Sequence, residues 1–126
     1  MKHIAILDDS ATLTDMMKFA LEYNGHQATA FHTGRDLLQI MRTVRFDGAI
    51  IDLHLPGLTD GIATIQEARQ LDSEMPILVM TGSGEALIRR AQQIIPDIPI
   101  MQKPFHVAQL LDWLKEPSQQ QALTRR

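Results

Sequence analysis

The stretch Gly48-Ala49-Ile50-Ile51-Asp52-Leu53-His54-Leu55-Pro56-Gly57 decides how the rest of the chain is interpreted. It is apolar up to a single carboxylate, Asp52, and then turns at Pro56-Gly57. A short run that is apolar at every position is typical of a strand covered on both faces. In open α/β folds, functional residues lie just outside the carboxyl ends of such strands. Asp52 is therefore the first candidate functional residue.

Four similar apolar runs occur elsewhere, and strands are expected at residues 3–7, 27–31, 47–51, 76–80 and 98–101. Each run is followed by apolar residues at helical spacing, expected to face inward: Leu13, Met16, Met17, Ala20, Leu21, Leu37, Ile40, Met41, Val44, Ile62, Ile65, Ala68, Leu71, Leu87, Ile88, Ala91, Ile94, Ile95, Val107, Leu110, Leu111 and Leu114. This alternation predicts an α/β fold, a flavodoxin-like doubly wound parallel sheet of five strands in order 2-1-3-4-5 with five helices.

Helix boundaries are marked by capping residues and prolines. Ser10 is a candidate N-cap, Thr33 and Asp36 form a candidate capping box, and Thr59-Asp60 can cap the next helix. Pro96 and Pro117 are expected to end the last two helices. The sequence thus predicts one domain over residues 1–116, followed by a polar, Gln-rich tail or linker start at residues 117–126.

Composition excludes several classes of protein. The 126 residues are 44% hydrophobic and 21% charged, with a net charge of −3 and no cysteine. Nucleic-acid and anionic-membrane surfaces require basic patches, which this chain lacks, so no partner of either kind is expected. No apolar segment is long enough to span a membrane. We expect a cytoplasmic protein.

Polar residues stand at the predicted carboxyl ends of four strands. Asp8 and Asp9 follow the first, Asp52 the third, Thr81 the fourth and Lys103 the fifth. The strand order would bring these residues into one crevice. Three neighbouring carboxylates persist ionised only beside a cation, and oxygen-only ligands suit Mg²⁺. The set therefore predicts a phosphoryl group on Asp52, held by metal, ammonium and hydroxyl.

These strand-end residues resemble those of the receiver domain of two-component response regulators, over residues 3 to about 115. The resemblance includes Pro56-Gly57 after Asp52, Gly82 after Thr81 and Pro104-Phe105 after Lys103. The resemblance implies that Asp52 accepts a phosphoryl group from a histidine kinase or phosphotransfer protein. It implies that Asp8, Asp9, Asp52 and the main-chain carbonyl of His54 hold Mg²⁺. Thr81 would be the switch hydroxyl, Lys103 the phosphoryl-binding cation, and Lys103-Pro104 a cis peptide.

The chain departs from the family pattern at Ile100, where receivers usually carry an aromatic residue. We expect Ile100 to be a core residue, and we hypothesise that Thr81 signals through residues 82–84 and the following helix. The side chains of His54 and Ser83, each two residues past a site residue, are candidates for tuning dephosphorylation. The sequence assigns no chemistry to the remaining histidines, which are His3, His26, His32 and His106.

The function that follows is a phosphorylation-controlled interaction switch without turnover of its own beyond phosphotransfer and dephosphorylation. A homodimer is one arrangement that the sequence leaves open. Three alternatives compete: a degenerate receiver that binds partners without phosphorylation, an aspartyl-phosphate phosphatase, and a flavin-binding protein. The phosphatase would need an Asp where His54 stands. The flavin protein would need a hydroxyl-rich phosphate loop where Asp8-Asp9 stands.

Overall fold

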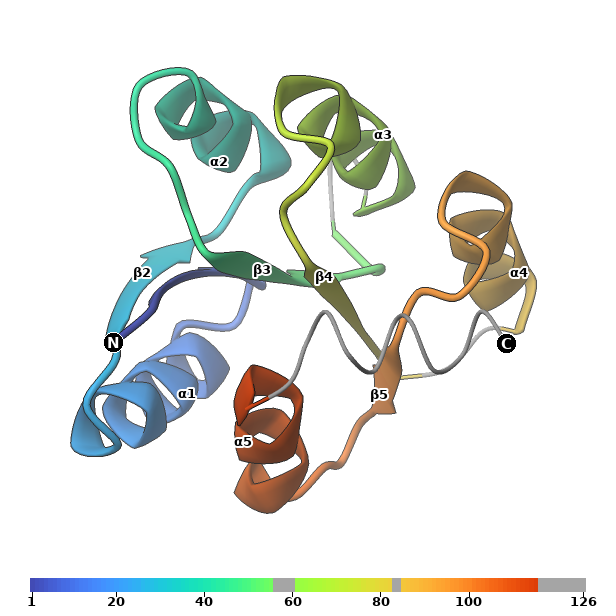
Figure 1. The fold of residues 1–126 in the computed structure, drawn as a ribbon. Coiled ribbons are helices and arrows are strands. Elements are labelled where there is room, and N and C mark those ends of the chain that lie inside the picture. Colours follow the sequence, from blue (N-terminus) through green and yellow to red (C-terminus); the bar gives the residue numbers. More distant parts are fainter. Residues whose placement is uncertain (56–60, 83–84, 116–126) are drawn as a thin grey trace.

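A computed structural model describes residues 1–55, 61–82 and 85–115 (Figure 1). Strands and helices alternate as β1 (His3–Leu7), α1 (Ala11–Tyr23), β2 (Gln27–Phe31), α2 (Gly34–Met41), β3 (Gly48–Asp52), α3 (Gly61–Leu71), β4 (Ile77–Thr81), α4 (Glu85–Ile94), β5 (Ile100–Gln102) and α5 (Val107–Lys115). The strands pair in parallel in the order β2-β1-β3-β4-β5. The predicted fold class and strand order are confirmed.

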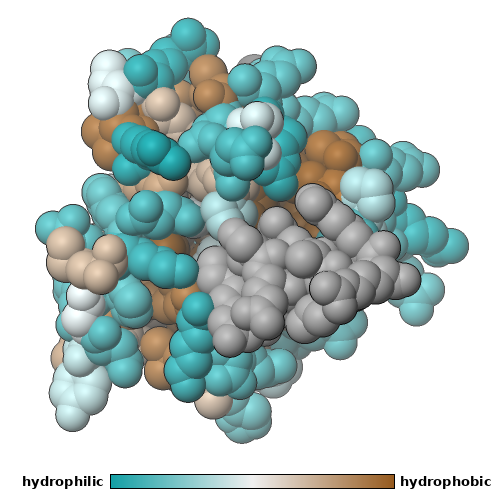
Figure 2. All heavy atoms as spheres, in the orientation of Figure 1, coloured by the Kyte–Doolittle hydropathy of each residue, from teal (hydrophilic) through white to brown (hydrophobic). Residues whose placement is uncertain are grey.

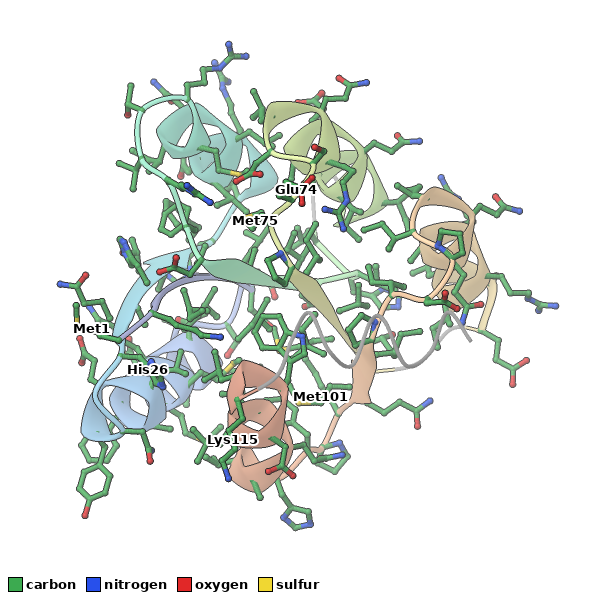
Figure 3. The ribbon with its side chains drawn as sticks, viewed as in Figure 1. Met1, His26, Glu74, Met75, Met101 and Lys115 are labelled. Atoms are coloured by element: carbon green, nitrogen blue, oxygen red, sulfur yellow. The ribbon has the colours of Figure 1, made fainter. Side chains whose placement is uncertain are left out.

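Two apolar clusters form the core, one on each face of the sheet. Helices α1 and α5 cover one face, and α2, α3 and α4 cover the other (Figure 1). Met75 belongs to one cluster and Met101 to the other, and they lie on opposite sides of the sheet (Figure 3). The strands are apolar throughout because successive side chains enter alternate clusters. This double cover leaves the strand ends as the place for polar groups.

Element boundaries agree with the predicted signals where the structure describes them. Ser10 and Thr33 are N-caps whose hydroxyls accept the N–H of Leu13 and Asp36. Strand β5 begins two residues later than predicted, after Pro99, which has no N–H to give to a ladder. The predicted turn at 56–57, the cap at 59–60 and the helix stop at 117 lie outside the described residues.

Four residues expected to face inward are instead exposed: Met16, Ile40, Val44 and Leu71. Ile40 and Leu71 lie in the last turns of α2 and α3, and Val44 lies three residues past the end of α2. The spacing was compatible with burial, but no element packs over these positions. Predictions of burial from periodicity were therefore wrong at these four residues.

Hydrophilic residues dominate the molecular face seen in Figure 2, with apolar side chains in small separate patches. Among the described helices, none is long and apolar enough to cross a bilayer.

A hydrogen bond joins the start of the chain to α5: the ammonium of Lys2 donates to the carbonyl of Leu114, 2.8 Å away. A cation at a helix C-terminus satisfies an unpaired carbonyl and complements the helix dipole. The start of β1 thereby holds the end of α5.

Candidate functional site

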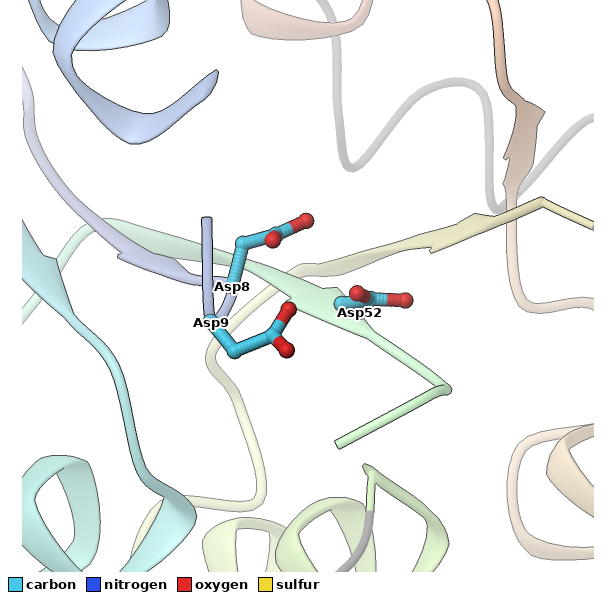
Figure 4. A group of neighbouring side chains, drawn as sticks. All are labelled: Asp8, Asp9 and Asp52. Carbon is cyan, nitrogen blue, oxygen red and sulfur yellow. The ribbon is translucent and has the colours of Figure 1, made fainter. Parts of the chain in front are cut away.

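The carboxyl ends of β1 and β3 bring three aspartates together. The ligand atoms of Asp8, Asp9 and Asp52 all lie within 4.8 Å of one another. The three side chains lie near one another at the ends of their strands (Figure 4). β1 pairs directly with β3, so residues that follow Leu7 and Ile51 must be neighbours. The juxtaposition that the sequence predicted is present.

Asp8 is fully buried, and every one of its polar groups is hydrogen-bonded. The N–H of Ser10 donates to its Oδ1 at 2.8 Å, and Lys103 Nζ lies 2.6 Å from its Oδ2. Burial alone would raise the pKa of Asp8, but the hydrogen bonds from Lys103 and Ser10 outweigh it and lower that pKa. Asp8 is held as a carboxylate in one orientation.

Asp52 is 2% exposed and is less well compensated. The N–H of His54 donates to its Oδ1 at 3.0 Å, and Lys103 Nζ is 3.2 Å from its Oδ2. Burial raises the pKa of Asp52; the His54 N–H opposes this rise and the negative charge of Asp8 adds to it. The pKa of Asp52 is raised overall, so its ionised form lacks part of the stabilisation that water would give.

Lys103 reaches into this site from the end of β5 and is the counter-charge for both buried aspartates. Its side chain is 27% exposed. Burial would lower the pKa of Lys103, but Asp8 and Asp52 together raise it, so the ammonium stays charged. Its main-chain N–H donates to the carbonyl of Thr81 at 2.8 Å, which ties the end of β5 to the end of β4. The Lys103-Pro104 bond is cis, as the resemblance implied.

Asp9 differs from the other two carboxylates because it is exposed. Among the residues that the structure describes, its side chain has no hydrogen-bond or ion-pair partner. Three carboxylates and one ammonium leave two negative charges unbalanced, in a cluster that offers only oxygen ligands. A divalent cation that prefers oxygen, such as Mg²⁺, fits this donor set.

The other predicted site residues that the structure describes differ in burial. Thr81, the last residue of β4, is fully buried. His54 lies beside Asp52 and is exposed, whereas Leu53 between them is buried. Ile100 is partly buried and packs against the cluster under α2, α3 and α4. Ser83 is outside the described residues, so its predicted role stays a prediction.

One residue beside the site was not predicted. The ring nitrogen Nδ1 of His32 lies 3.0 Å from the main-chain oxygen of Asp8. We expected no contact between His32 and the site, because nothing in its sequence neighbourhood distinguishes it from the other histidines. Its position in the sequence could have predicted this contact. His32 directly follows β2 as Asp8 directly follows β1, and the two strands pair in parallel.

Comparison with known proteins agrees with this geometry. The sequence profile described as the response regulator receiver domain matches residues 4–115. The chain belongs to the response regulator receiver family. The receiver is 30% identical over 103 residues to the transcriptional regulatory protein FixJ of Bradyrhizobium diazoefficiens, covering 82% of this chain and 50% of FixJ. It is 27% identical to the uncharacterised transcriptional regulatory protein YkoG of Bacillus subtilis, covering 86% of this chain and 47% of YkoG.

The receiver thus spans about half the length of these curated relatives. Solved structures agree on the fold. A response regulator receiver protein from Sinorhizobium medicae matches with a TM-score of 0.82 at 27% identity, covering 98% of this chain and 96% of that one. The receiver domain of the sensor histidine kinase PA1611 from Pseudomonas aeruginosa, with magnesium coordinated in its active-site cleft, matches with a TM-score of 0.81 at 22% identity, covering 91% and 95%.

Proposed function

We propose that this receiver accepts a phosphoryl group on Asp52 and thereby switches a protein-interaction surface in a two-component phosphorelay. The observation that carries this is the pairing of a buried, incompletely compensated carboxylate with a fixed ammonium 3.2 Å away. A carboxylate oxygen of Asp52 attacks the phosphorus of a phosphohistidine. The N–P bond breaks, the imidazole of the donor leaves, and an aspartyl phosphate forms.

The receiver's own residues supply orientation and charge for this transfer. The His54 N–H fixes Oδ1 of Asp52, and Lys103 stands where the phosphoryl oxygens would carry negative charge. Phosphoryl transfer depends mainly on such positioning and electrostatic stabilisation. Thr81, buried at the end of β4, would offer its hydroxyl to the phosphoryl group, and Ser83 and the His54 side chain are candidates for tuning its hydrolysis.

Mg²⁺ is the cofactor that this donor set fits best. Asp9 and Asp52 would hold it directly, Asp8 mainly through water, and the His54 carbonyl would add a fourth oxygen. When bound, the ion would neutralise the phosphoryl oxygens during transfer. The magnesium in the PA1611 receiver supports the same assignment here.

The alternative functions fit the site less well. A degenerate receiver would have no reason to keep the acidic cluster, Thr81 and Lys103 together. An aspartyl-phosphate phosphatase needs a second carboxylic acid two residues after the nucleophile, and the residue there is His54, exposed and not an acid. We therefore propose a phosphoacceptor rather than an enzyme that turns over phosphate esters.

Incubation with acetyl phosphate and MgCl₂, followed by intact-mass measurement, tests the proposal. Wild type should gain one phosphate adduct, and Asp52→Asn should gain none. Asp112→Asn, an exposed aspartate on α5, is the control and should label like wild type. An unlabelled wild type would favour the degenerate receiver, and continuous phosphate release from small phosphate esters would favour the phosphatase.

The partner proposed for this reaction is a histidine kinase or histidine phosphotransfer protein, and we propose that it docks on α1. This helix begins two residues after Asp9. Its outer face presents Phe19 and Tyr23, which are 69% and 83% exposed and stacked with ring centroids 6.2 Å apart. Large exposed aromatic rings are characteristic of protein-binding surfaces.

Combined Phe19→Ala and Tyr23→Ala substitution should therefore slow phosphotransfer from a protein donor roughly 10-fold or more, since truncating interface anchors commonly costs over 1 kcal/mol each. Labelling by acetyl phosphate should not change, because the substitutions are far from Asp52. The donor can be found by screening purified phosphorylated histidine kinases against wild type. Equal slowing with both donors would contradict a docking role.

A further inference from the structure

His32 occupies a rigid position at the rim of the acidic cluster. It follows the last residue of β2, Phe31, and precedes Thr33, the N-cap of α2. The main-chain N–H of Asp8 donates to the carbonyl of Phe31 at 3.1 Å, one step beyond the last paired residues of β1 and β2. Both neighbours of His32 are therefore fixed by main-chain or capping hydrogen bonds, and its ring is presented toward β1.

The contact between His32 and Asp8 has a defined polarity. Nδ1 of His32 lies 3.0 Å from the main-chain oxygen of Asp8. A carbonyl oxygen only accepts hydrogen bonds, so Nδ1 carries the proton and donates. The side chain of Asp8 needs no help from this contact, because Ser10 and Lys103 already hold both of its carboxylate oxygens.

What the His32 hydrogen bond does fix is the peptide unit that joins Asp8 to Asp9. That unit is planar, so holding its oxygen sets the direction in which the chain enters Asp9. Asp9 is the one carboxylate of the cluster without a hydrogen-bond or ion-pair partner among the described residues, and it is exposed. Its direction therefore depends on its main chain.

We propose that His32 is a positioning residue for cation binding, which aims Asp9 at the metal site by donating from Nδ1 to the main-chain carbonyl of Asp8. This inference rests on the proposed function, because the cation it serves is the Mg²⁺ of phosphoryl transfer. Residues that orient metal ligands commonly contribute 10- to 100-fold to metal affinity. His32 acts on an exposed ligand, so the lower end of that range is expected.

Three variants distinguish the Nδ1 hydrogen bond from other effects of the His32 ring. His32→Ala removes the donor, and His32→Gln places an amide nitrogen one bond further from the main chain than Nδ1. His32→Asn places an amide nitrogen where Nδ1 was and should restore the hydrogen bond. His106→Ala, which changes another exposed histidine, is the control.

The measurement is Mg²⁺ affinity by isothermal titration calorimetry in the absence of any phosphodonor. We expect roughly 10-fold weaker binding for His32→Ala and His32→Gln, and binding within about twofold of wild type for His32→Asn and His106→Ala. Amide hydrogen exchange of Asp9 and Ser10 in metal-free protein should be faster in His32→Ala and return to the wild-type rate in His32→Asn.

Unchanged affinity in His32→Ala, or equal loss in His32→Ala and His32→Asn, would overturn the inference. These outcomes differ from failure of the proposed function, in which wild type itself would bind no Mg²⁺ or take no phosphate on Asp52. The same labelling yield in all His32 variants at saturating MgCl₂ would agree with a positioning role, since excess cation offsets weaker binding. Loss of labelling at saturation would contradict it.

Discussion

At the scale of single residues, the two buried aspartates are stabilised unequally by the same lysine. Asp52 has a raised pKa, so the folded protein binds a proton there more readily than the unfolded chain does. Its contribution to stability is complete below the pKa of the unfolded chain and is lost as the pH rises through the folded pKa. At neutral pH the ionised Asp52 is therefore a net cost to the metal-free fold.

Asp52→Asn should accordingly raise the free energy of unfolding at pH 7 by roughly 0.5–2 kcal/mol in EDTA, as other relieved charge clusters do. The gain should shrink as the pH is lowered toward 4, because wild-type Asp52 becomes protonated. Thermal melts between pH 4 and pH 8 measure this, with Asp112→Asn as an exposed control. A variant less stable than wild type at pH 7 would show that Asp52 is already fully compensated.

Substituting Lys103 should have the opposite effect and lower the free energy of unfolding. Lys103→Met leaves Asp8 and Asp52 without their shared cation, and removing one partner of buried charges costs roughly 1–3 kcal/mol. The lower half of that range is expected because the lysine is 27% exposed. Saturating Mg²⁺ should recover more stability in Lys103→Met than in wild type, because the cluster is then more negative.

Melting temperatures with EDTA and with MgCl₂ measure both effects of this substitution. Lys115→Met is the matched control, since Lys115 is exposed and its ion-pair partner among the described residues, Asp112, is 4.0 Å away. If Lys103→Met melted like this control in EDTA, Lys103 would not be the stabilising counter-charge of the site.

At the scale of elements, the start of α3 lies so close to the end of β3 that it restricts which residue can follow beside Asp52. A Cβ added to Gly61, the first residue of α3, would lie 2.3 Å from the main-chain oxygen of Asp52 and 2.6 Å from Cα of Leu53. Both are main-chain atoms, so they cannot move aside as a side chain would. Only glycine allows α3 to start this close to the end of β3.

Gly61→Ala should therefore destabilise the fold by about 1–3 kcal/mol, the usual cost of overpacking. It should also displace the main chain around Asp52 and slow labelling by acetyl phosphate. Gly82→Ala is the control for stability, since a Cβ there meets no atom of the described residues within 4 Å. Thermal melts and labelling rates report the two effects, and wild-type behaviour of Gly61→Ala in both would contradict the constraint.

The elements also show how much the sequence could predict. The alternating apolar runs predicted the sheet and its strand order, and the polar residues at their ends predicted the meeting of Asp8, Asp9, Asp52 and Lys103. The helix caps followed separately from Ser10 and Thr33. The contact of His32 with Asp8 did not, because it depends on a ring reaching across to a neighbouring strand's main chain. The exposure of Met16 and Leu71 was missed because periodicity identifies a helix face but not what covers it.

At the scale of the whole molecule, a signal from Asp52 has to reach the surface without an aromatic residue at position 100, where this chain has Ile100. Ile100 packs against the same core cluster as Leu87 and Ile88 of α4. Only Ala91 of α4 is fully buried, so this helix is the least firmly held among those described. A change at Thr81 should therefore appear in α4 first.

Beryllofluoride, a mimic of the phosphoryl group, should shift amide NMR signals across α4 (Glu85–Ile94) more than those of α2 (Gly34–Met41). Two-dimensional spectra with and without the mimic measure this. Asp52→Asn is the control and should show no shifts. Unmoved signals throughout α4 in wild type would exclude this helix as the output of the switch.

The ring of Trp113 has a practical consequence for all of these experiments. It is the only tryptophan of the chain, is 2% exposed, and packs against Gly48 at the amino end of β3, whereas Asp52 is at the carboxyl end. Its intrinsic fluorescence should resist collisional quenchers and change sharply when the domain unfolds. A single built-in fluorophore at the far edge of the sheet therefore monitors global melting and leaves events at the acidic cluster optically silent.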